Sequence, residues 1–484
     1  MTLLHTFASC GRVRTSSTKR SRRSSREPQA GRRCTVSEMP YRPARVISLA
    51  LAFLVAGCAA QVATPRAEPS PSASAKPSPT NATTDVLYIQ GAGSGADARI
   101  SVIDARTGTI VRDLPNGVLS RDRSLLYATQ TLKGGTQTQI RVLELASGRE
   151  TRSLTIDGYF HTLFDYYAPV GPAGDGSWLV LTGDPIKLDD KYVTRYAVVN
   201  TLSGAASSIE LRGDSPYEFV AVSPDGKRMY FTDLSSSSQP VGIRAFDITT
   251  RALALAPVAG SSWNKWQAGG WRSGIVTSAD GRWSYSVNTG TEESPFILAL
   301  DAVNDRAQRI ELPPDQAAGF EKAMLWSLVP SNDGKVLYAV NPAIGAINEI
   351  AIPSMTIRRS AHIPVSRADG GALAALRQAL FPVADAKRLL RSGATLSPDG
   401  RTLYAAGERG VAVIDTDTLT ERTVLAKDVS YDTLSLSPDG ERMYVITPDA
   451  WSTIAIIRTR DGSSAGGFRL PWYPGAIVRV DLGG

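Results

Sequence analysis

The sequence predicts an all-β fold of repeated four-stranded antiparallel sheets, and three observations support this prediction. A hairpin-turn phrase recurs along the chain, a second short turn follows it, and the two ends of the repeated region carry complementary half-units. Recurrence at a fixed spacing is typical of repeat architectures.

The recurring phrase is Ser-Pro-Asp-Gly, which occurs at residues 223–226, 397–400 and 437–440. Serine offers an acceptor to the backbone that follows it, proline presets φ at the second turn position, and glycine adopts the left-handed conformation that closes the turn. β-branched and aromatic residues flank each copy, as is typical of strands. Each copy therefore predicts two strands, A and B, joined by a tight turn.

Looser copies extend the series along most of the chain. The aspartates of the turns lie between 40 and 66 residues apart, at Asp122, Asp175, Asp225, Asp280, Asp333, Asp399 and Asp439. A second short turn follows in ISVIDARTG (100–108), ILALDAVND (297–305) and VAVIDTDT (411–418). It joins two more strands, C and D, so each unit is predicted to be a four-stranded meander.

The ends of the repeated region predict that the array closes on itself. It begins with VLYIQG (86–91), a B strand without an A strand, and ends with AIVRVDL (476–482), an A strand without a B strand. Pairing these halves closes the ring and removes the exposed sheet edges that an open array would carry. B strands are expected at Val86, Leu125, Trp178, Met229, Trp283, Leu337, Leu403 and Met443. The prediction is an eight-bladed β-propeller of four-stranded antiparallel blades closed by the N- and C-terminal strands, with seven blades as the alternative because the turn at Asp175 is weakest.

The units resemble those of YVTN-type and WD-repeat-like β-propellers, as in bacterial propeller lipoproteins, because SPDG, LY, VID and T follow one another in that order. The resemblance covers residues 86–482. The Trp-Asp signature of true WD repeats is missing, and ARTGTIVRDL (105–114) lacks the Gly-Lys-x-x-Trp ending of quinone-cofactor propellers. The resemblance therefore implies a fold and no cofactor, since one fold hosts many functions.

The N-terminal segment predicts a lipoprotein signal. Residues 1–58 contain eleven basic and two acidic side chains, a net charge of +9. The whole chain has a net charge of +7, so the remaining residues carry −2. No nucleic-acid partner is therefore expected. Arg42 and Arg45 precede a short apolar run, 46–56, that leads to Cys58. Residues 54–58 resemble the lipobox of bacterial lipoproteins, which implies that Cys58 is lipidated. An ordinary cleaved signal with a coincidental cysteine is the alternative.

These features divide the chain into three parts. Residues 1–57 are expected to be an over-extended start plus the signal peptide, with Met39 as the true start. Residues 58–84 are expected to be a lipidated cysteine and a disordered Pro/Ser/Ala tether. Residues 85–484 form the propeller, with a helical insertion at about 366–392. The expected location is extracytoplasmic, on the cell surface or the periplasmic side of a bacterial membrane.

Few side chains in the propeller suit catalysis. The cysteines are Cys10, Cys34 and Cys58, and only His161 and His362 follow the signal. The sequence therefore predicts no metal site and no cofactor. The weak catalytic candidates are His161 and the nearby Asp165, against a packed or solvated loop histidine.

Loop lengths point to one face of the propeller. In a meander, A–B and C–D turns share one face, while B–C and D–A connections share the other, and here the long connections all fall on the second face. Aromatic residues gather in or beside its connections: Tyr166, Tyr167, Trp263, Trp266, Trp326, Trp472 and Tyr473. They either wedge between neighbouring blades or form a platform for a ligand.

The sequence thus favours a membrane-anchored extracytoplasmic lipoprotein with a monomeric propeller. The propeller is predicted to act as a binding or scaffold module for a protein or glycan partner through its loop-rich face. The alternative is a propeller enzyme, lactonase-like or a glycan lyase or hydrolase, at the channel mouth. The scarcity of histidine favours binding.

The lipidation of Cys58 can be tested directly. Cys58→Ala is expected to leave uncleaved precursor, while the wild-type chain partitions into the detergent phase and carries at least two acyl chains, because one chain anchors only marginally. Mass spectrometry of the N-terminal peptide checks the acyl content, and Cys34→Ala is the matched control that should behave as wild type. A free thiol on a soluble mature N-terminus contradicts the prediction.

Overall fold

The computed structural model describes residues 84–91, 99–165, 168–169, 176–233, 242–261, 271–289, 294–313, 322, 325–365, 393–407, 409–427, 429, 431, 433–447 and 452–483. The chain divides into two units, Met1–Lys76 and Pro77–Gly484, and all of the described residues belong to the second. The predicted signal, Cys58, most of the tether and the helical insertion lie outside the described residues.

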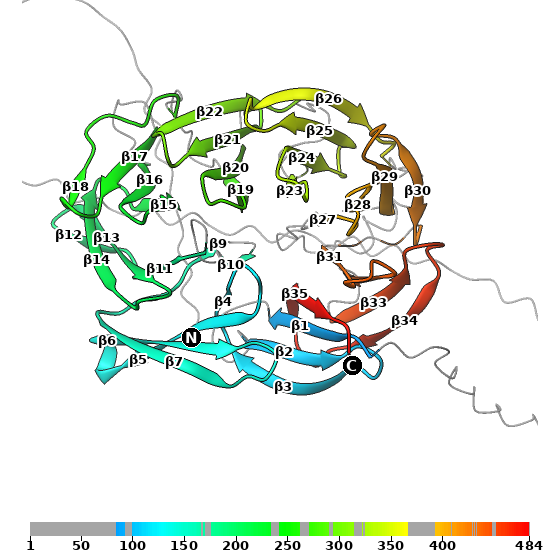
Figure 1. The fold of residues 1–484 in the computed structure, drawn as a ribbon, viewed down its shortest axis with the longest axis horizontal. Coiled ribbons are helices and arrows are strands. Elements are labelled where there is room, and N and C mark those ends of the chain that lie inside the picture. Colours follow the sequence, from blue (N-terminus) through cyan, green and yellow to red (C-terminus); the bar gives the residue numbers. More distant parts are fainter. Residues whose placement is uncertain are drawn as a thin grey trace, which may run out of the picture. The chain divides into compact units, whose positions relative to one another are not determined.

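The described strands form eight large antiparallel sheets, which are the blades of a β-propeller (Figure 1). This confirms the predicted fold and the count of eight. From the inner strand outward, the first four blades are blade 1, β35 (Pro474–Asp481), β1 (Val86–Gly91), β2 (Arg99–Asp104) and β3 (Thr109–Pro115); blade 2, β4 (Val118–Leu119), β5 (Leu125–Leu132), β6 (Gln137–Glu144) and β7 (Glu150–Asp157); blade 3, β8 (His161–Thr162), β11 (Trp178–Thr182), β13 (Lys191–Asn200) and β14 (Ala206–Gly213); and blade 4, β15 (Tyr217–Val222), β16 (Arg228–Asp233), β17 (Gly242–Asp247) and β18 (Ala252–Leu253).

The remaining four blades follow the same order. They are blade 5, β19 (Trp271–Thr277), β20 (Trp283–Thr289), β21 (Phe296–Asp301) and β22 (Arg306–Glu311); blade 6, β23 (Ser327–Pro330), β24 (Val336–Asn341), β25 (Ala346–Ala351) and β26 (Thr356–His362); blade 7, β27 (Ala394–Leu396), β28 (Thr402–Gly407), β29 (Gly410–Asp415) and β30 (Glu421–Leu425); and blade 8, β31 (Thr433–Leu436), β32 (Arg442–Ile446), β33 (Thr453–Arg458) and β34 (Ser464–Arg469). A short 3-10 turn, η2 (Lys133–Gly135), joins β5 to β6.

Blade 3 departs from the repeat at the point where its turn phrase is weakest. Between β8 and β11 the chain forms a separate two-stranded ribbon from β9 (Phe164–Asp165) and β10 (Ala168–Pro169). The blade also has a fifth strand, β12 (Ile186–Leu188), which pairs with β13 beyond the end of β11. The blade nevertheless has all four of its repeat strands. The alternative of seven blades came from its weak turn phrase and not from a missing strand.

The Ser-Pro-Asp-Gly turns are held by a hydrogen-bond network. In blade 4, Ser223 Oγ donates to Asp225 Oδ1 at 2.6 Å and accepts from Arg228 N at 3.0 Å, while Asp225 Oδ1 accepts from Lys227 N at 3.1 Å. The serine hydroxyl thus accepts a hydrogen bond from the backbone N–H five residues further along the chain. The aspartate carboxylate accepts one from the backbone N–H two residues further along. Gly226 has a φ of 68°, as the left-handed turn position requires. The same serine-to-aspartate bond, at 2.5–2.7 Å, recurs at Ser120, Ser278, Ser331, Ser397 and Ser437.

These turns also affect how stability depends on pH. The hydroxyl of Ser331 and the backbone N–H of Lys335 lower the pKa of Asp333, and Ser397 lowers that of Asp399 in the same way. A carboxylate whose pKa is lowered by folding stabilises the fold above its ordinary pKa. That contribution is lost as the pH falls through the lowered value.

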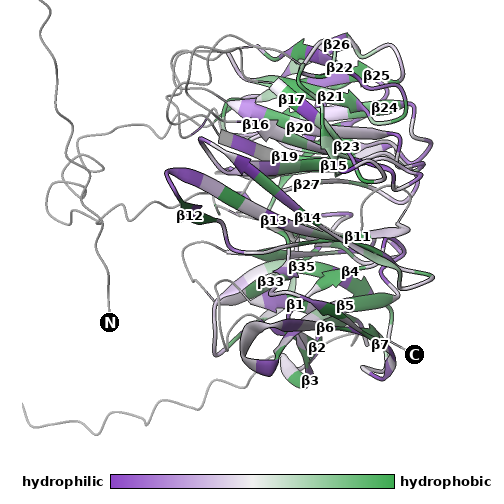
Figure 2. Cartoon of the chain, turned by 90° about the vertical axis from the view of Figure 1, so that its left-hand side faces the viewer, coloured by the Kyte–Doolittle hydropathy of each residue, from purple (hydrophilic) through white to green (hydrophobic). Residues whose placement is uncertain are grey.

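The hydrophobic core lies between blades. Each buried cluster combines strands of two neighbouring blades, as where Tyr285 and Val287 of blade 5 pack with Leu337 and Ala339 of blade 6. Figure 2 shows hydrophobic residues along the blade strands. Each blade is therefore stabilised chiefly by its two neighbours.

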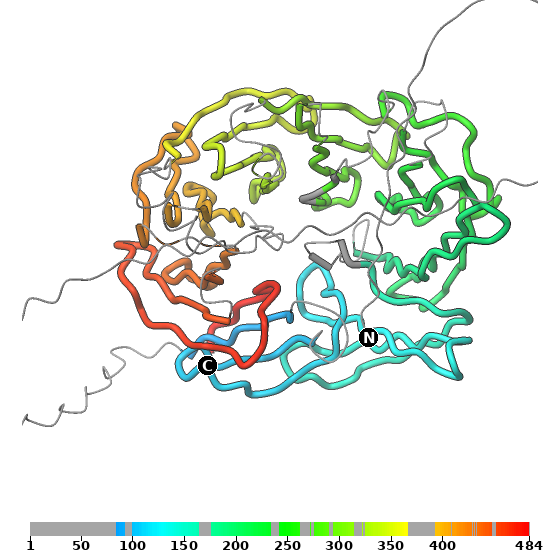
Figure 3. The backbone as a smooth tube through the Cα atoms, turned by 180° about the vertical axis from the view of Figure 1, so that it is seen from behind, coloured from blue at the N-terminus to red at the C-terminus, as the bar shows by residue number. Residues whose placement is uncertain are grey.

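The ring closes where the ends of the propeller meet in blade 1 (Figure 3). The register of β1 and β35 runs from the pair Val86 and Asp481 to the pair Gly91 and Pro474. The buried Asp85 carboxylate accepts hydrogen bonds from Arg442 Nε at 2.8 Å, from Arg442 Nη2 at 3.2 Å and from the Tyr444 hydroxyl of blade 8. A buried ion pair thus ties the first residues of the propeller to the last complete blade.

Removing this carboxylate tests its role in closure. Asp85→Ala is expected to lower the free energy of unfolding by about 3–5 kcal/mol, because it leaves the buried Arg442 charge without its principal partner. Urea denaturation measures the loss. Asp417→Ala, which removes an exposed aspartate from a C–D turn, is the control and should change stability little. Equal midpoints for the two variants contradict the proposed role.

Candidate functional site

The described part of the loop-rich face is dominated by a hairpin of blade 3. β12 pairs with β13 in the register Ile186–Val193, Lys187–Tyr192 and Leu188–Lys191. The two-residue turn between them has positive φ at both Asp189 (47°) and Asp190 (64°), as in a type I′ hairpin turn. Figure 2 shows that β12 projects from the rest of the propeller. Residues 183–193 are called the blade-3 hairpin below.

The blade-3 hairpin exposes apolar side chains among charges of both signs. Ile186 and Leu188 lie on one face of β12, because alternate residues of a strand share a face, and are 38% and 44% exposed. Tyr159 is 43% exposed and lies beside the hairpin base, where its carbonyl oxygen is 3.0 Å from the position that a Cβ would take at Gly183.

Ion pairs flank these apolar groups. Lys187 Nζ lies 3.8 Å from Asp190 Oδ1, and Lys191 Nζ pairs with Asp214 in the next D–A connection. The Lys187 ammonium also lies 5.9 Å from the centre of the Tyr192 ring. Apolar side chains surrounded by charged ones are typical of a protein interaction surface.

His161 lies at the base of the same hairpin and is held by Asp184. Its Nε2 is 3.2 Å from Asp184 Oδ1, and its Nδ1 is 3.1 Å from the Thr162 carbonyl oxygen. The side chain of Asp165, the partner considered from the sequence, lies outside the described residues, and sequence reasoning missed Asp184. Among the described residues no hydroxyl contacts either ring nitrogen of His161, so this part of the chain shows no histidine-activated nucleophile.

The aromatic residues of the D–A connections divide into buried and exposed side chains. Trp326 and Trp472 are 3% and 9% exposed, whereas Tyr473 is largely exposed. Tyr166, Tyr167, Trp263 and Trp266 lie outside the described residues. One apolar or aromatic side chain in or next to each of seven D–A connections is buried between neighbouring blades: Phe160, Tyr217, Val258, Trp326, Ile363, Tyr431 and Trp472. The positions of Trp326 and Trp472 therefore agree with the wedge alternative.

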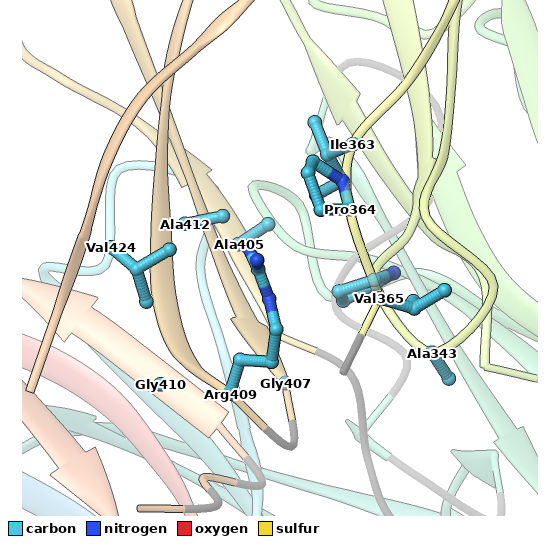
Figure 4. A pocket seen from close by; sticks show the side chains of 11 residues that line it. Ala343, Ile363, Pro364, Val365, Ala405, Gly407, Arg409, Gly410, Ala412 and Val424 are labelled. Atoms are coloured by element: carbon cyan, nitrogen blue, oxygen red, sulfur yellow. The ribbon is translucent and has the colours of Figure 1, made fainter. Parts of the chain in front are cut away.

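A small cleft lies between blades 6 and 7 (Figure 4). The Arg409 guanidinium enters it and forms an ion pair with Glu421 at 2.5 Å. The cleft leaves about 20 Å³ for the centres of water molecules, which suits water better than a ligand. Its other lining residues are apolar: Pro342, Ala343, Ile363, Pro364, Val365, Ala405, Gly407, Gly410, Ala412 and Val424.

Neither a metal centre nor a membrane-spanning helix is seen in the part of the chain that the structure describes. No three histidine, cysteine, aspartate or glutamate side chains are grouped there so that they could hold an ion. No helix within those residues is long and apolar enough to cross a bilayer.

Comparisons with solved structures return other proteins of low sequence identity. AztD from Citrobacter koseri is 12% identical with a TM-score of 0.45, over 82% of this chain and 98% of that chain. The periplasmic gluconolactonase PpgL from Pseudomonas aeruginosa is 16% identical with a TM-score of 0.37, over 74% and 98%. The Cps50 (Swd1) β-propeller domain from Myceliophteria thermophila is 10% identical with a TM-score of 0.35, over 73% and 95%. No protein-family model matches the chain, and no curated protein is significantly similar to it in sequence.

The wedge role of Trp326 can be separated from ligand binding. Trp326→Ala is expected to cost about 3 kcal/mol or more of unfolding free energy, because truncating a buried tryptophan leaves a cavity between blades 5 and 6. Tyr473→Ala, at an exposed position of another D–A connection, is the control and should cost much less. Thermal and urea denaturation compare the two. Trp326→Ala with wild-type stability contradicts the wedge role.

Proposed function

We propose that the chain is a membrane-anchored extracytoplasmic lipoprotein whose propeller binds a protein or glycan partner through its loop-rich face. The observation that carries the partner-binding part of this proposal is the blade-3 hairpin, which extends beyond its blade and exposes Ile186 and Leu188 among charged residues. Exposed aliphatic side chains favour a protein partner over a glycan, whose recognition relies more on polar groups and aromatic rings.

The point where the chain enters the propeller supports this use of the loop-rich face. Thr84 donates from Oγ1 to the Gly483 carbonyl oxygen at 2.6 Å, and Asp85 lies against Arg442, next to the A–B turn of blade 8. The propeller therefore begins on its tight-turn face. The tether predicted for residues 58–84 would then join the lipid to that face. The opposite face is then left open to a partner.

An enzyme remains the second candidate, and the His161–Asp184 pair is the observation that favours it. An aspartate beside a histidine is part of many hydrolytic sites. Here both side chains are solvent-exposed, at 39% and 71%, and exposed ion pairs contribute little to stability. His161→Ala separates the two functions, since it should abolish a hydrolytic activity and leave partner binding by the hairpin nearly unchanged.

The hairpin surface can be tested by crosslinking in the cells that produce the protein. Ile186→Ser with Leu188→Ser is expected to weaken capture of a specific partner by about 2 kcal/mol, the scale of an interface hot spot, without a change in melting temperature. Leu202→Ser is the matched control, because Leu202 is an exposed leucine of the same blade on the tight-turn face. The same partner captured equally by both variants contradicts the proposal, and a glycan array run in parallel identifies a carbohydrate partner.

A further inference from the structure

The A–B turn of blade 2 breaks the repeat in a specific way. The other described turns keep glycine at the fourth position of Ser-Pro-Asp-Gly, but blade 2 reads Ser120-Arg121-Asp122-Arg123. Arg123 adopts the left-handed conformation of that glycine, with a φ of 58°, although a residue with a Cβ is unfavourable there. Arginine thus replaces both residues that the repeat uses for turn geometry. Backbone conformation does not explain these replacements, and such strain is typical of functional positions.

Arg121 reaches across the central channel. Its Nη2 donates to the carbonyl oxygen of Ser278 at 3.0 Å. Ser278 begins the A–B turn of blade 5, which is not a neighbour of blade 2. A–B turns connect the two innermost strands of each blade, so a bond between these turns crosses the channel mouth on the tight-turn face.

Two further guanidinium groups lie at the same mouth. Arg479, on the innermost strand of blade 1, donates from Nη1 to the Arg123 carbonyl oxygen, and its Nε pairs with Asp481 at 2.5 Å. The Arg123 side chain is partly exposed to solvent. The protein atoms around it still remove part of its hydration, and this desolvation, together with the charge of Arg479, lowers the pKa of Arg123. No carboxylate contributes to this shift, so none offsets the charge of Arg123.

The nearby carboxylates are already engaged. Asp122 accepts hydrogen bonds from Ser120 Oγ at 2.6 Å and from Ser124 Oγ at 2.8 Å. Asp481 pairs with Arg479. Among the described residues, no carboxylate lies within ion-pair distance of Arg121 or Arg123. Two guanidinium groups from one turn are thus available to an external anion.

We propose that Arg121 and Arg123, supported by Arg479, form a binding site for a phosphate group at the tight-turn mouth of the channel. The planar forks of guanidinium groups match the oxygens of phosphate, and their bonds to an anion are roughly twice as strong as neutral hydrogen bonds. The site is independent of the proposed partner surface on the opposite face. Because the chain enters the propeller on this face, the phosphate can belong to a lipid headgroup or to a free anion.

The test restores the repeat. Arg121→Pro with Arg123→Gly rebuilds Ser-Pro-Asp-Gly in blade 2 of the full chain, so the melting temperature in phosphate-free buffer should stay the same or rise, since left-handed strain is removed. The affinity for inorganic phosphate, measured by calorimetry at fixed ionic strength, should fall at least about tenfold, as expected for the loss of charged hydrogen bonds. Arg401→Ala is the matched control, because Arg401 is an exposed arginine beside the equivalent turn of blade 7.

Vesicles distinguish the two sources of phosphate. Vesicles of phosphatidylglycerol are compared with vesicles of phosphatidylcholine for wild type, the double variant and Arg401→Ala, which differ only at these arginines. Binding of phosphatidylglycerol that the double variant loses identifies a headgroup, while binding of inorganic phosphate alone identifies a free anion. The proposal is overturned if wild type binds neither probe, or if the double variant binds as wild type does. Equal losses for the double variant and Arg401→Ala also overturn it, since they indicate general surface charge.

Discussion

The pairing of β1 with β35 is the interaction on which the rest of the structure depends. Every buried cluster of the propeller is shared by two blades, so a blade with one neighbour missing exposes half of its core. The chain supplies blade 1 from both of its ends, and the Asp85–Arg442 pair then fixes that blade against blade 8. Closure also pairs β1 with β35, so that β1 is not left as an unpaired edge strand.

Closure also determines how the two faces can be used. Because β1 starts and β35 ends on the tight-turn face, both ends of the propeller lie there. The B–C and D–A connections of the other face are free to change length, since no closing contact depends on them. The blade-3 hairpin uses this freedom. It extends β13 to ten residues and places apolar side chains beyond the blade without disturbing the ladder beneath it.

The sequence predicts the parts of this fold that local chemistry determines. The eight B strands begin within one residue of their expected positions, and five of them follow a turn that has serine, aspartate and glycine at the expected places. Apart from the pairing of the two ends, it does not predict contacts between residues that are distant in the chain. Asp184 meets His161 only because the chain bends between β11 and β12, and Arg121 meets Ser278 only because the ring closes. Burial of Trp326 and Trp472 was one of two alternatives, since an aromatic residue before an inner strand suits both a wedge and a platform.

The uniformity of the tight turns makes the exception in blade 2 informative. Six turns share one hydrogen-bond network, in which serine and aspartate have the same partners whether or not proline is present. That network tolerates Arg121 and Arg123 because it relies on Ser120 and Asp122, which blade 2 retains. Side chains can therefore be exchanged at the other two positions without loss of the turn, at the cost of a left-handed arginine. The long loops of the opposite face differ from blade to blade, so no loop can be compared with an equivalent one. A charged residue in a tight turn can be recognised as a departure from the repeat, whereas a charged residue in a loop cannot.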